Sequence, residues 1–340
     1  MSFRNDLERV ASLDLPWEDL DGTNILVTGA TGLIGSALVD LLMFRSHAKY
    51  QVFASGRNEE RLKKRFAEYV GHPNFHLIRY DVTASLESEI DFHIIIDAAS
   101  GASPQLYSTD PVGVMKANFL GVENLLSYGI AHKLKRFLYI SSGEIYGEGG
   151  EKKITEDYSG YVNCASVRAC YPSSKRAAET LCESYAHQYG VDVRIARPCH
   201  IYGPNFMETD KRVYAQFIRN VLKNEDIVLK SDGSQFRSWC YVVDCVSALL
   251  YILLKGKSGE AYNVADESSN ISIRELAEMV ASIGNKKVVF DIPEALEKEG
   301  YNVVKKSIFS AGKLNELGWT VSGTMKEKMK KTIDEAFLLR

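Results

Sequence analysis

Tyr171 and Lys175 are the two residues of this sequence whose types and spacing most directly suggest chemistry. They stand four positions apart at the start of a strongly helical stretch, so their side chains share one face of the helix. Upstream, a buried strand is followed by Ser142 and Glu144, which supply a hydroxyl and a carboxylate. A tyrosine removes a proton from an alcohol near neutral pH only if its pKa of about 10 falls by roughly three units. The Lys175 ammonium is one source of that lowering, and Ser142 can hold the same hydroxyl.

A glycine-rich segment, NILVTGATGLIGS at residues 24–36, follows a strand and opens a helix. Glycine is needed there because the chain must turn tightly, the backbone must approach a pyrophosphate and the helix must pack close to the strand. Exposed N–H groups and the helix dipole then hold the phosphates. The segment therefore predicts a nicotinamide dinucleotide, whose oxidised ring is a second source of a lower tyrosine pKa. The cofactor contacts that we expect from this turn are Gly29, Thr31, Gly32, Leu33, Ile34 and Gly35.

The residues after the second and third predicted strands bear on the identity of the dinucleotide. A site specific for NAD usually offers an acid to the ribose 2′-hydroxyl, but Arg57 and Asn58 stand there instead. Arg57 can pair with a 2′-phosphate, which favours NADP, or it can be an exposed arginine at the start of a helix. Asp81 and Val82 follow the third strand, where a short acid can meet the adenine edge or occupy a surface turn.

The elements that position these residues alternate along the chain. Apolar runs predict strands at residues 25–28, 51–54, 75–80, 92–98, 136–141 and 191–196. Helices are predicted at residues 33–44, 112–132, 173–189, 213–223, 242–254 and 272–283. This repetition predicts an α/β fold, a Rossmann doubly wound parallel sheet with a smaller α/β substrate-binding lobe.

The same pattern suggests how the chain is divided into domains. We expect a helix and arm at residues 1–22 and a dinucleotide-binding domain at 23–198, which the chain rejoins near 238–266. The substrate lobe is then built mainly from residues 199–340.

Composition excludes several classes of protein. The chain has 340 residues, and 41 Lys and Arg against 44 Asp and Glu give a net charge of -3, which argues against a nucleic-acid binder. No apolar run approaches the roughly 18 residues of a membrane-spanning helix. The N-terminus lacks the apolar segment of a secretion signal, and the six cysteines lack a C-x-x-C pair or zinc spacing. We expect no metal, no membrane partner and a reducing, cytoplasmic location.

With the glycine turn, the serine-rich strand end and the Tyr171 and Lys175 pair in this order, the sequence resembles the extended short-chain dehydrogenase/reductase superfamily. The resemblance covers residues 23–335 and is to its nucleotide-sugar epimerases, dehydratases and decarboxylases. Four stretches are most similar to the UDP-glucuronate decarboxylases, also called UDP-xylose synthases. These stretches are residues 99–104 with Tyr107, residues 168–180, residues 211–217 and residues 233–237.

The resemblance implies a reaction. These enzymes transiently oxidise carbon 4 of a nucleotide sugar, and the resulting ketone acidifies or labilises the substituent at carbon 5. Glu144 matches a glutamate that acts near carbon 5, and Arg237 matches an arginine that meets the substrate carboxylate or diphosphate. The implied catalytic residues are Ser142, Glu144, Tyr171 and Lys175.

The resemblance also implies binding residues and partners. A nucleotide sugar is the expected substrate, NAD is the family's usual cofactor and is expected to be tightly retained, and a homodimer is expected through a four-helix interface. Further cofactor contacts are Ala98, Ala99, Tyr171, Lys175 and Pro198. Substrate contacts are Ser103, Asn205, Arg212 and Arg237.

Three departures from the family pattern keep other activities open. Gly143 stands where dTDP-glucose 4,6-dehydratases carry an aspartate and decarboxylases commonly carry a serine, Asp97 replaces a histidine, and Arg57 replaces an acid. A 4,6-dehydratase, an epimerase, an NADPH-dependent 4-keto-sugar reductase and a non-catalytic dinucleotide sensor are therefore the alternatives. Cys199 or His200 can add acid–base chemistry or serve in packing alone.

Overall fold

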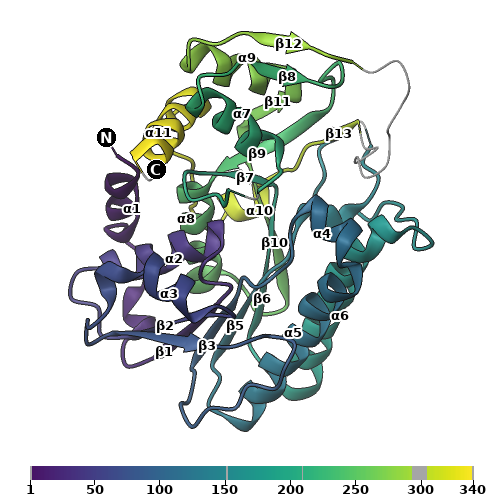
Figure 1. Ribbon diagram of the computed structural model, residues 1–340. Coiled ribbons are helices and arrows are strands. Elements are labelled where there is room, and N and C mark those ends of the chain that lie inside the picture. Colours follow the sequence, from purple (N-terminus) through teal and green to yellow (C-terminus); the bar gives the residue numbers. More distant parts are fainter. Residues whose placement is uncertain (1, 151, 209, 293–304, 339–340) are drawn as a thin grey trace.

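Seven parallel strands form the central sheet of the computed structural model, in the order β10-β6-β5-β4-β1-β2-β3 (Figure 1). The structure describes residues 2–150, 152–208, 210–292 and 305–338. The strands are β1 (Asn24–Thr28), β2 (Gln51–Gly56), β3 (Phe75–Arg79), β4 (Ile94–Asp97), β5 (Arg136–Ile140), β6 (Val193–Pro198) and β10 (Glu260–Val264). Strand order reverses between β1 and β4, which is where ligands bind in open sheets of this kind.

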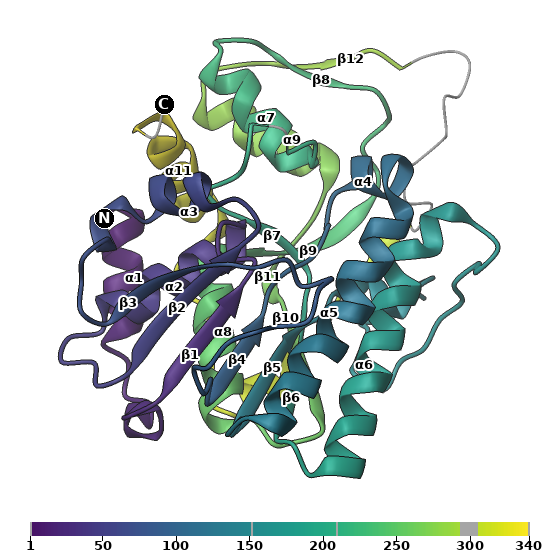
Figure 2. The ribbon, with the colours of Figure 1, turned by 60° about the horizontal axis from the view of Figure 1, so that its bottom comes forward.

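Helices cover both faces of this sheet (Figure 2). Ile25 and Val27 of β1 belong to one core cluster and Leu26 to the other, because successive side chains of a strand point to opposite faces. The helices on the first face are α1 (Phe3–Ala11), α2 (Leu33–Phe44), α3 (Glu59–Arg65) and α8 (Val242–Lys255). Those on the second face are α5 (Pro111–Ala131) and α6 (Cys170–Tyr189), which pack along each other. These layers confirm the predicted Rossmann α/β fold.

A smaller part of the molecule lies beyond the carboxyl ends of the central strands. Its main sheet is centred on β9 (Phe236–Tyr241), which pairs with β7 (His200–Tyr202), β11 (Asp266–Ser272) and β13 (Lys306–Ser307). A two-stranded sheet joins β8 (Ile227–Leu229) to β12 (Val288–Phe290). The helices of this part are α7 (Val213–Leu222), α9 (Ile273–Ile283) and α11 (Met325–Leu338), while the short α10 (Gly312–Asn315) packs against β10 and α8.

Short elements complete the connections. One α-helix, α4 (Pro104–Thr109), precedes α5, and the 3-10 turns are η1 (Trp17–Leu20), η2 (Ala67–Tyr69), η3 (Gly143–Tyr146) and η4 (Val167–Ala169). Residues 2–20 pack in the same core cluster as α2 and α8, through side chains such as Phe3 and Trp17.

The predicted elements and the structure differ mainly at their ends. The helix predicted at 33–44 is α2 without change, whereas the helix predicted from residue 173 begins at Cys170. Pro172 then lies in the first helical turn, where its missing N–H costs nothing because that group has no helical partner. Within 238–266 the chain rejoins the first part of the molecule through α8, which packs on the central sheet, and β10, which extends that sheet, while β9 and β11 lie in the second sheet. The domain boundary near residue 198 stays a prediction.

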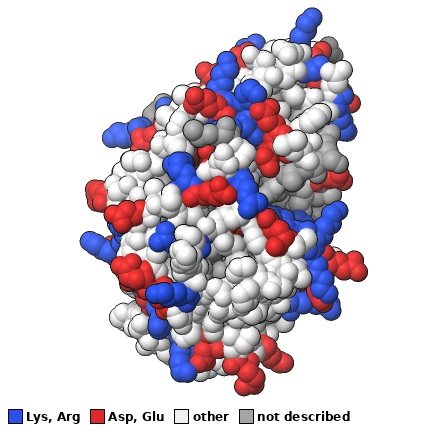
Figure 3. Space-filling view, turned by 90° about the vertical axis from the view of Figure 1, so that its left-hand side faces the viewer, with Lys and Arg blue, Asp and Glu red and all other residues white. Residues whose placement is uncertain are grey.

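Charged side chains of both signs are interspersed on the face that carries α1 and α3 (Figure 3). Along the residues that the structure describes, no helix has the length and apolar character needed to cross a membrane. In the same part of the chain no set of three His, Cys, Asp or Glu side chains is grouped as metal ligands would be.

Lys328 of α11 is a buried cation that joins distant elements. Its Nζ lies 2.7 Å from Oδ2 of Asp244 on α8 and 3.1 Å from Oδ2 of Asp266 on β11. Because Lys328→Met leaves two buried carboxylates without their cation, we expect a loss of about 3–5 kcal/mol of unfolding free energy.

Urea unfolding followed by circular dichroism measures this loss. The control is Lys330→Met, which removes an exposed pair with Asp334 on the same helix and should change stability by less than about 0.5 kcal/mol. Equal effects of the two substitutions would contradict the assignment.

Candidate active site

The glycine turn has the geometry of a phosphate cradle. Gly29 has a φ of +58°, and a Cβ on it would lie 2.6 Å from the carbonyl oxygen of Ala98. A Cβ on Gly35 would lie 2.5 Å from the carbonyl oxygen of Gly29. Gly32 is the N-cap of α2 and has no side chain to satisfy the first N–H groups of the helix. These residues therefore fit the pyrophosphate of a dinucleotide.

The predicted adenosine end lies beyond β2 and β3. Asn58 caps α3 by accepting a hydrogen bond from the Arg61 N–H at 2.8 Å, while the side chain of Arg57 is exposed. The Asp81 carboxylate accepts hydrogen bonds from the backbone and hydroxyl of Thr83. Although partial burial acts to raise it, the pKa of Asp81 is lowered by these bonds and by the charge of Arg57. Arg57 and Asp81 thus act on each other electrostatically, while Val82 is buried.

Lys175 lies on the inner face of α6 and is buried. Its Nζ donates to the carbonyl of Ile140 at the end of β5, at 2.7 Å, and lies 4.6 Å from the centroid of the Tyr139 ring. Burial lowers the pKa of Lys175 to about 8, and the negative charges of Asp97 and Glu179 oppose this shift. Its ammonium is therefore held by the strand end that also carries Ser142.

Tyr171 is also buried, one helical turn before Lys175, and its ring stacks on that of Tyr107 at a centroid distance of 4.9 Å. Burial, followed by the charge of Glu144, raises the pKa of Tyr171 to about 12. Hydrogen bonds with Ser142 and Ser100 act in the opposite direction. The lowered pKa expected from the sequence is therefore not a property of the protein alone, because desolvation outweighs the hydrogen bonds.

Glu144 lies in η3, directly after β5, and is paired with an arginine. Nη2 of Arg168 donates to both carboxylate oxygens of Glu144, at 2.9 and 2.7 Å. The Ser142 hydroxyl caps η3 by accepting from the Glu144 N–H at 3.2 Å. The structure thus brings the four predicted catalytic residues, Ser142, Glu144, Tyr171 and Lys175, together at the carboxyl end of β5.

Gly143, between Ser142 and Glu144, faces an aromatic ring from the second part of the molecule. A Cβ on Gly143 would lie 2.5 Å from Cζ of Phe309. Phe309 is buried with Tyr146 and Ile154, so its ring has little room to move. The missing side chain at position 143 is therefore explained by Phe309, which fills its place.

The predicted substrate residues lie on the second part and on α4. Arg237 of β9 is buried, which lowers its pKa to about 10, and the charge of Glu144 opposes that shift. Arg212 precedes α7 and makes a bidentate pair with Asp210. Ser103 is the N-cap residue of α4, and Asn205 follows β7. Arg237 is the member of this set that acts electrostatically on a predicted catalytic residue.

The surroundings of His200 and Cys199 favour a packing role for both side chains over acid–base chemistry. Burial, with the charges of Arg237 and Arg212, lowers the pKa of His200 to about 4, and its ring lies 5.2 Å from that of Trp239. Burial raises the pKa of the Cys199 thiol well above its usual value. At neutral pH both side chains are therefore uncharged. Pro198 ends β6 just before them.

Sequence reasoning missed a buried polar chain behind Tyr171. The Ser100 hydroxyl donates to Oδ1 of Asn118 at 2.8 Å, and Nδ2 of Asn118 donates to the hydroxyl of Ser174 at 2.9 Å. Asn118 is fully buried on α5, so a polar residue on an otherwise apolar helix face was the signal that could have found it.

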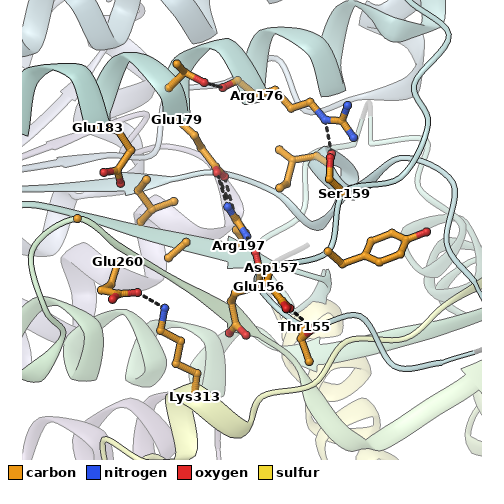
Figure 4. A pocket seen from close by; sticks show the side chains of 16 residues that line it. Thr155, Glu156, Asp157, Ser159, Arg176, Glu179, Glu183, Arg197, Glu260 and Lys313 are labelled. Atoms are coloured by element: carbon orange, nitrogen blue, oxygen red, sulfur yellow. Dashed lines mark hydrogen bonds and ion pairs between the residues drawn. The ribbon is translucent and has the colours of Figure 1, made fainter.

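A cavity of about 780 Å³ lies on the other side of α6 (Figure 4). It is lined by Glu179 and Glu183 of α6 and by Glu260 and Lys313, and none of the four predicted catalytic residues reaches it. Arg197 binds Glu179 there, with Nη2 2.7 Å from Oε2. Arg197 also donates to the hydroxyl of Tyr146 in η3 at 2.9 Å. The ion pair of Arg197 and Glu179 therefore supports η3 from the side of this cavity.

Comparison with known proteins places this arrangement in a family. The model of the NAD dependent epimerase/dehydratase family matches residues 25–265. The chain belongs to this family. It is 36% identical over 319 residues to UDP-glucuronic acid decarboxylase 6 of Arabidopsis thaliana, covering 93% of this chain and 89% of that protein.

Two further relatives extend the comparison. UDP-glucuronic acid decarboxylase 1 of Danio rerio is 34% identical over 319 residues, covering 92% of this chain and 72% of that protein. Among solved structures, UDP-glucose 4-epimerase of Thermotoga maritima with UDP-glucose has a TM-score of 0.79 and 26% identity, covering 92% of this chain and 98% of that one. The predicted family and its decarboxylase branch are confirmed.

The contact of Gly143 with Phe309 predicts a stability effect. Gly143→Ala should cost about 1–3 kcal/mol of unfolding free energy, because the added methyl group meets the ring in a packed cluster. In the Phe309→Leu background the same change should cost less, since the ring tip is gone.

A double-mutant cycle by urea unfolding measures this coupling. Gly150→Ala is the control, because a Cβ there would meet nothing within 4 Å. Additive effects of the substitutions at positions 143 and 309 would contradict the packing explanation.

Proposed function

We propose that the protein decarboxylates UDP-glucuronate through transient oxidation at carbon 4 of the sugar. The observation that carries this proposal is the electrostatic interaction of Glu144 with the buried guanidinium of Arg237, in a site where the charge of Glu144 also acts on Tyr171. Such a pair suits a substrate that carries a carboxylate at carbon 5, since a guanidinium matches that anion. The decarboxylase relatives support the same substrate.

NAD is the cofactor that the cradle and the family favour, and when bound it takes a hydride from the sugar and later returns it. Gly29, Gly32 and Gly35 would hold its pyrophosphate. The positive charge of Arg57 by itself favours a 2′-phosphate, but the nearby negative charge of Asp81 offsets it and disfavours such a phosphate. We therefore propose NAD over NADP, and we propose that it stays bound between turnovers.

Tyr171 has the task of accepting the proton of the carbon 4 hydroxyl at its Oη. Its pKa of about 12 must fall for this step. The hydrogen bonds with Ser142 and Ser100 already act in that direction, and the Lys175 ammonium adds positive charge nearby. Because Lys175 has a pKa of about 8, its positive charge is present below that pH and is lost above it.

Oxidation at carbon 4 makes the substrate a β-keto acid, in which the bond from carbon 5 to the carboxylate can break. Carbon dioxide leaves, the electron pair passes to the carbon 4 oxygen, and a proton then adds at carbon 5. No proton donor to a carbon 6 hydroxyl is needed, which agrees with Gly143 and Phe309 in place of an acid. A 4,6-dehydratase needs such a donor, and position 143 does not supply one. Dehydration therefore ranks second to decarboxylation.

We further propose a homodimer through α5 and α6. Val112, Met115 and Phe119 of α5 are exposed and recur at helical spacing along one side of it. The two helices lie together at one side of the molecule (Figure 2). The cytoplasmic location expected from the sequence stays a prediction.

The decarboxylase proposal predicts turnover without added cofactor. Purified protein is denatured and its released nucleotide is identified by mass spectrometry, and native protein is incubated with UDP-glucuronate while carbon dioxide is measured. We expect NAD and carbon dioxide. Tyr171→Phe should keep the nucleotide but lower turnover by about a hundredfold or more, because proton transfer is lost.

Tyr189→Phe, an exposed tyrosine on the same helix, is the control and should leave turnover unchanged. If UDP-glucuronate stays intact while dTDP-, GDP- or CDP-hexoses react, the decarboxylase proposal is wrong and a dehydratase, epimerase or reductase takes its place.

The dimer proposal predicts that Phe119→Asp makes the protein monomeric in sedimentation velocity, because a charge is then placed in an apolar interface. Phe337→Asp is the control, since Phe337 is an exposed phenylalanine on α11. A parent protein that sediments as a monomer would exclude the proposed interface.

A further inference from the structure

Arg168 contacts two of the side chains that surround Tyr171, yet the proposed reaction gives it no role. Its Nη2 binds both carboxylate oxygens of Glu144. Its guanidinium carbon also lies 4.6 Å from the centroid of the Tyr107 ring, which in turn stacks on Tyr171. One cation therefore holds both the carboxylate and the aromatic ring next to Tyr171.

The position of Arg168 is fixed by its own segment. It lies in η4, where the Ser166 hydroxyl accepts a hydrogen bond from its N–H, and η4 runs directly into α6 at Cys170. Arg168 is thus three residues before Tyr171 on a continuous helical path. Arg168 therefore fixes where the Glu144 carboxylate lies relative to Tyr171.

The ion pair of Arg168 and Glu144 is partly buried. Both side chains are about seven-tenths covered, with 28% and 29% of their surface exposed. The charge of Glu144 acts to raise the pKa of Tyr171, and that of Arg168 acts to lower it. Arg168 therefore offsets the charge that Glu144 would otherwise place beside the tyrosine.

We propose that Arg168 is a positioning residue that fixes the Glu144 carboxylate and the Tyr107 ring for the step at carbon 5. This inference rests on the proposed decarboxylation, in which Glu144 acts near that carbon. Arg168 does not itself need to touch the substrate, and its loss should separate the two halves of the reaction.

The test compares oxidation at carbon 4 with loss of carbon dioxide in single turnovers with UDP-glucuronate. Absorbance of the reduced cofactor reports the first step and released carbon dioxide reports the second. The variants are Arg168→Met, Arg168→Lys and Glu144→Gln. The control is Arg274→Met, because Arg274 also pairs with a glutamate, Glu278, and lies over the ring of Phe290, but both side chains of this pair are more than half exposed.

In Arg168→Met we expect carbon dioxide release to slow by about a hundredfold, the order of loss that misplacing a reacting group by an ångström causes. Reduced cofactor should then accumulate. The pH at which it forms at half its maximal rate should rise, because a cation that lowers the pKa of Tyr171 is gone. Arg168→Lys should release carbon dioxide at a rate between those of the parent and of Arg168→Met, since an ammonium keeps the charge but cannot replace the planar contact with Tyr107.

A double-mutant cycle checks that Arg168 acts through Glu144. Adding Arg168→Met to Glu144→Gln should slow carbon dioxide release much less than it does in the parent, because one of the two groups that Arg168 holds is already changed. Release within about twofold of the parent, or additive effects in the cycle, would overturn the inference.

Failure of the proposed function can be distinguished experimentally from failure of this inference. If the parent releases no carbon dioxide, the decarboxylation is wrong. Crystal structures of the parent and of Arg168→Met with bound UDP then decide the role of Arg168. A Glu144 side chain that turns away in the variant supports positioning, whereas an unchanged Glu144 overturns it.

Discussion

The burial of the Lys175 ammonium is the constraint on which the site depends. A buried charge costs several kcal/mol unless other groups compensate it. Here the carbonyl of Ile140, the ring of Tyr139 and the charge of Asp97 do so. These groups come from the ends of β5 and β4, so two strands and α6 must meet at one place. A parallel sheet meets this requirement, because the carboxyl ends of its strands lie along one edge.

The end of β4 also lies directly against the glycine turn that forms the phosphate cradle. The hydroxyl of Thr28 donates to Asp97 at 2.6 Å, and Asp97 accepts from the N–H of Ala99 at 3.2 Å. The intervening Ala98 is the residue whose carbonyl leaves no room for a side chain on Gly29. Asp97, where the family usually has histidine, is therefore a link between the cradle and the lysine. The three consecutive residues 97–99 therefore connect the glycine turn to the surroundings of Lys175.

Local pattern was enough to predict six of the seven central strands, the helix at 33–44 and the four catalytic candidates, because period and spacing are properties of neighbouring residues, but it missed β10 and the short strands of the second part. It could not predict the contact of Gly143 with Phe309, which joins residues far apart in the chain. It gave a lowered pKa for Tyr171 because a sequence does not show how completely the phenol is buried. Arg168 was part of a matching stretch, but its contact with Glu144 depends on how η3 and η4 meet in space.

The two parts of the molecule contribute differently to the chemistry. In the proposed reaction, the groups for oxidation at carbon 4 come from the part of the molecule built on the central sheet, whereas Arg237 and Phe309 come from the second part. Arg237 pairs with Ser307 between β9 and β13, and the N–H of Phe309 donates to the hydroxyl of Ser238 at 3.0 Å. The guanidinium and the ring are therefore held next to η3 by connected segments of the second part. The second part thus determines which side chains stand beside the loop after β5, where the proposed reaction has its step at carbon 5.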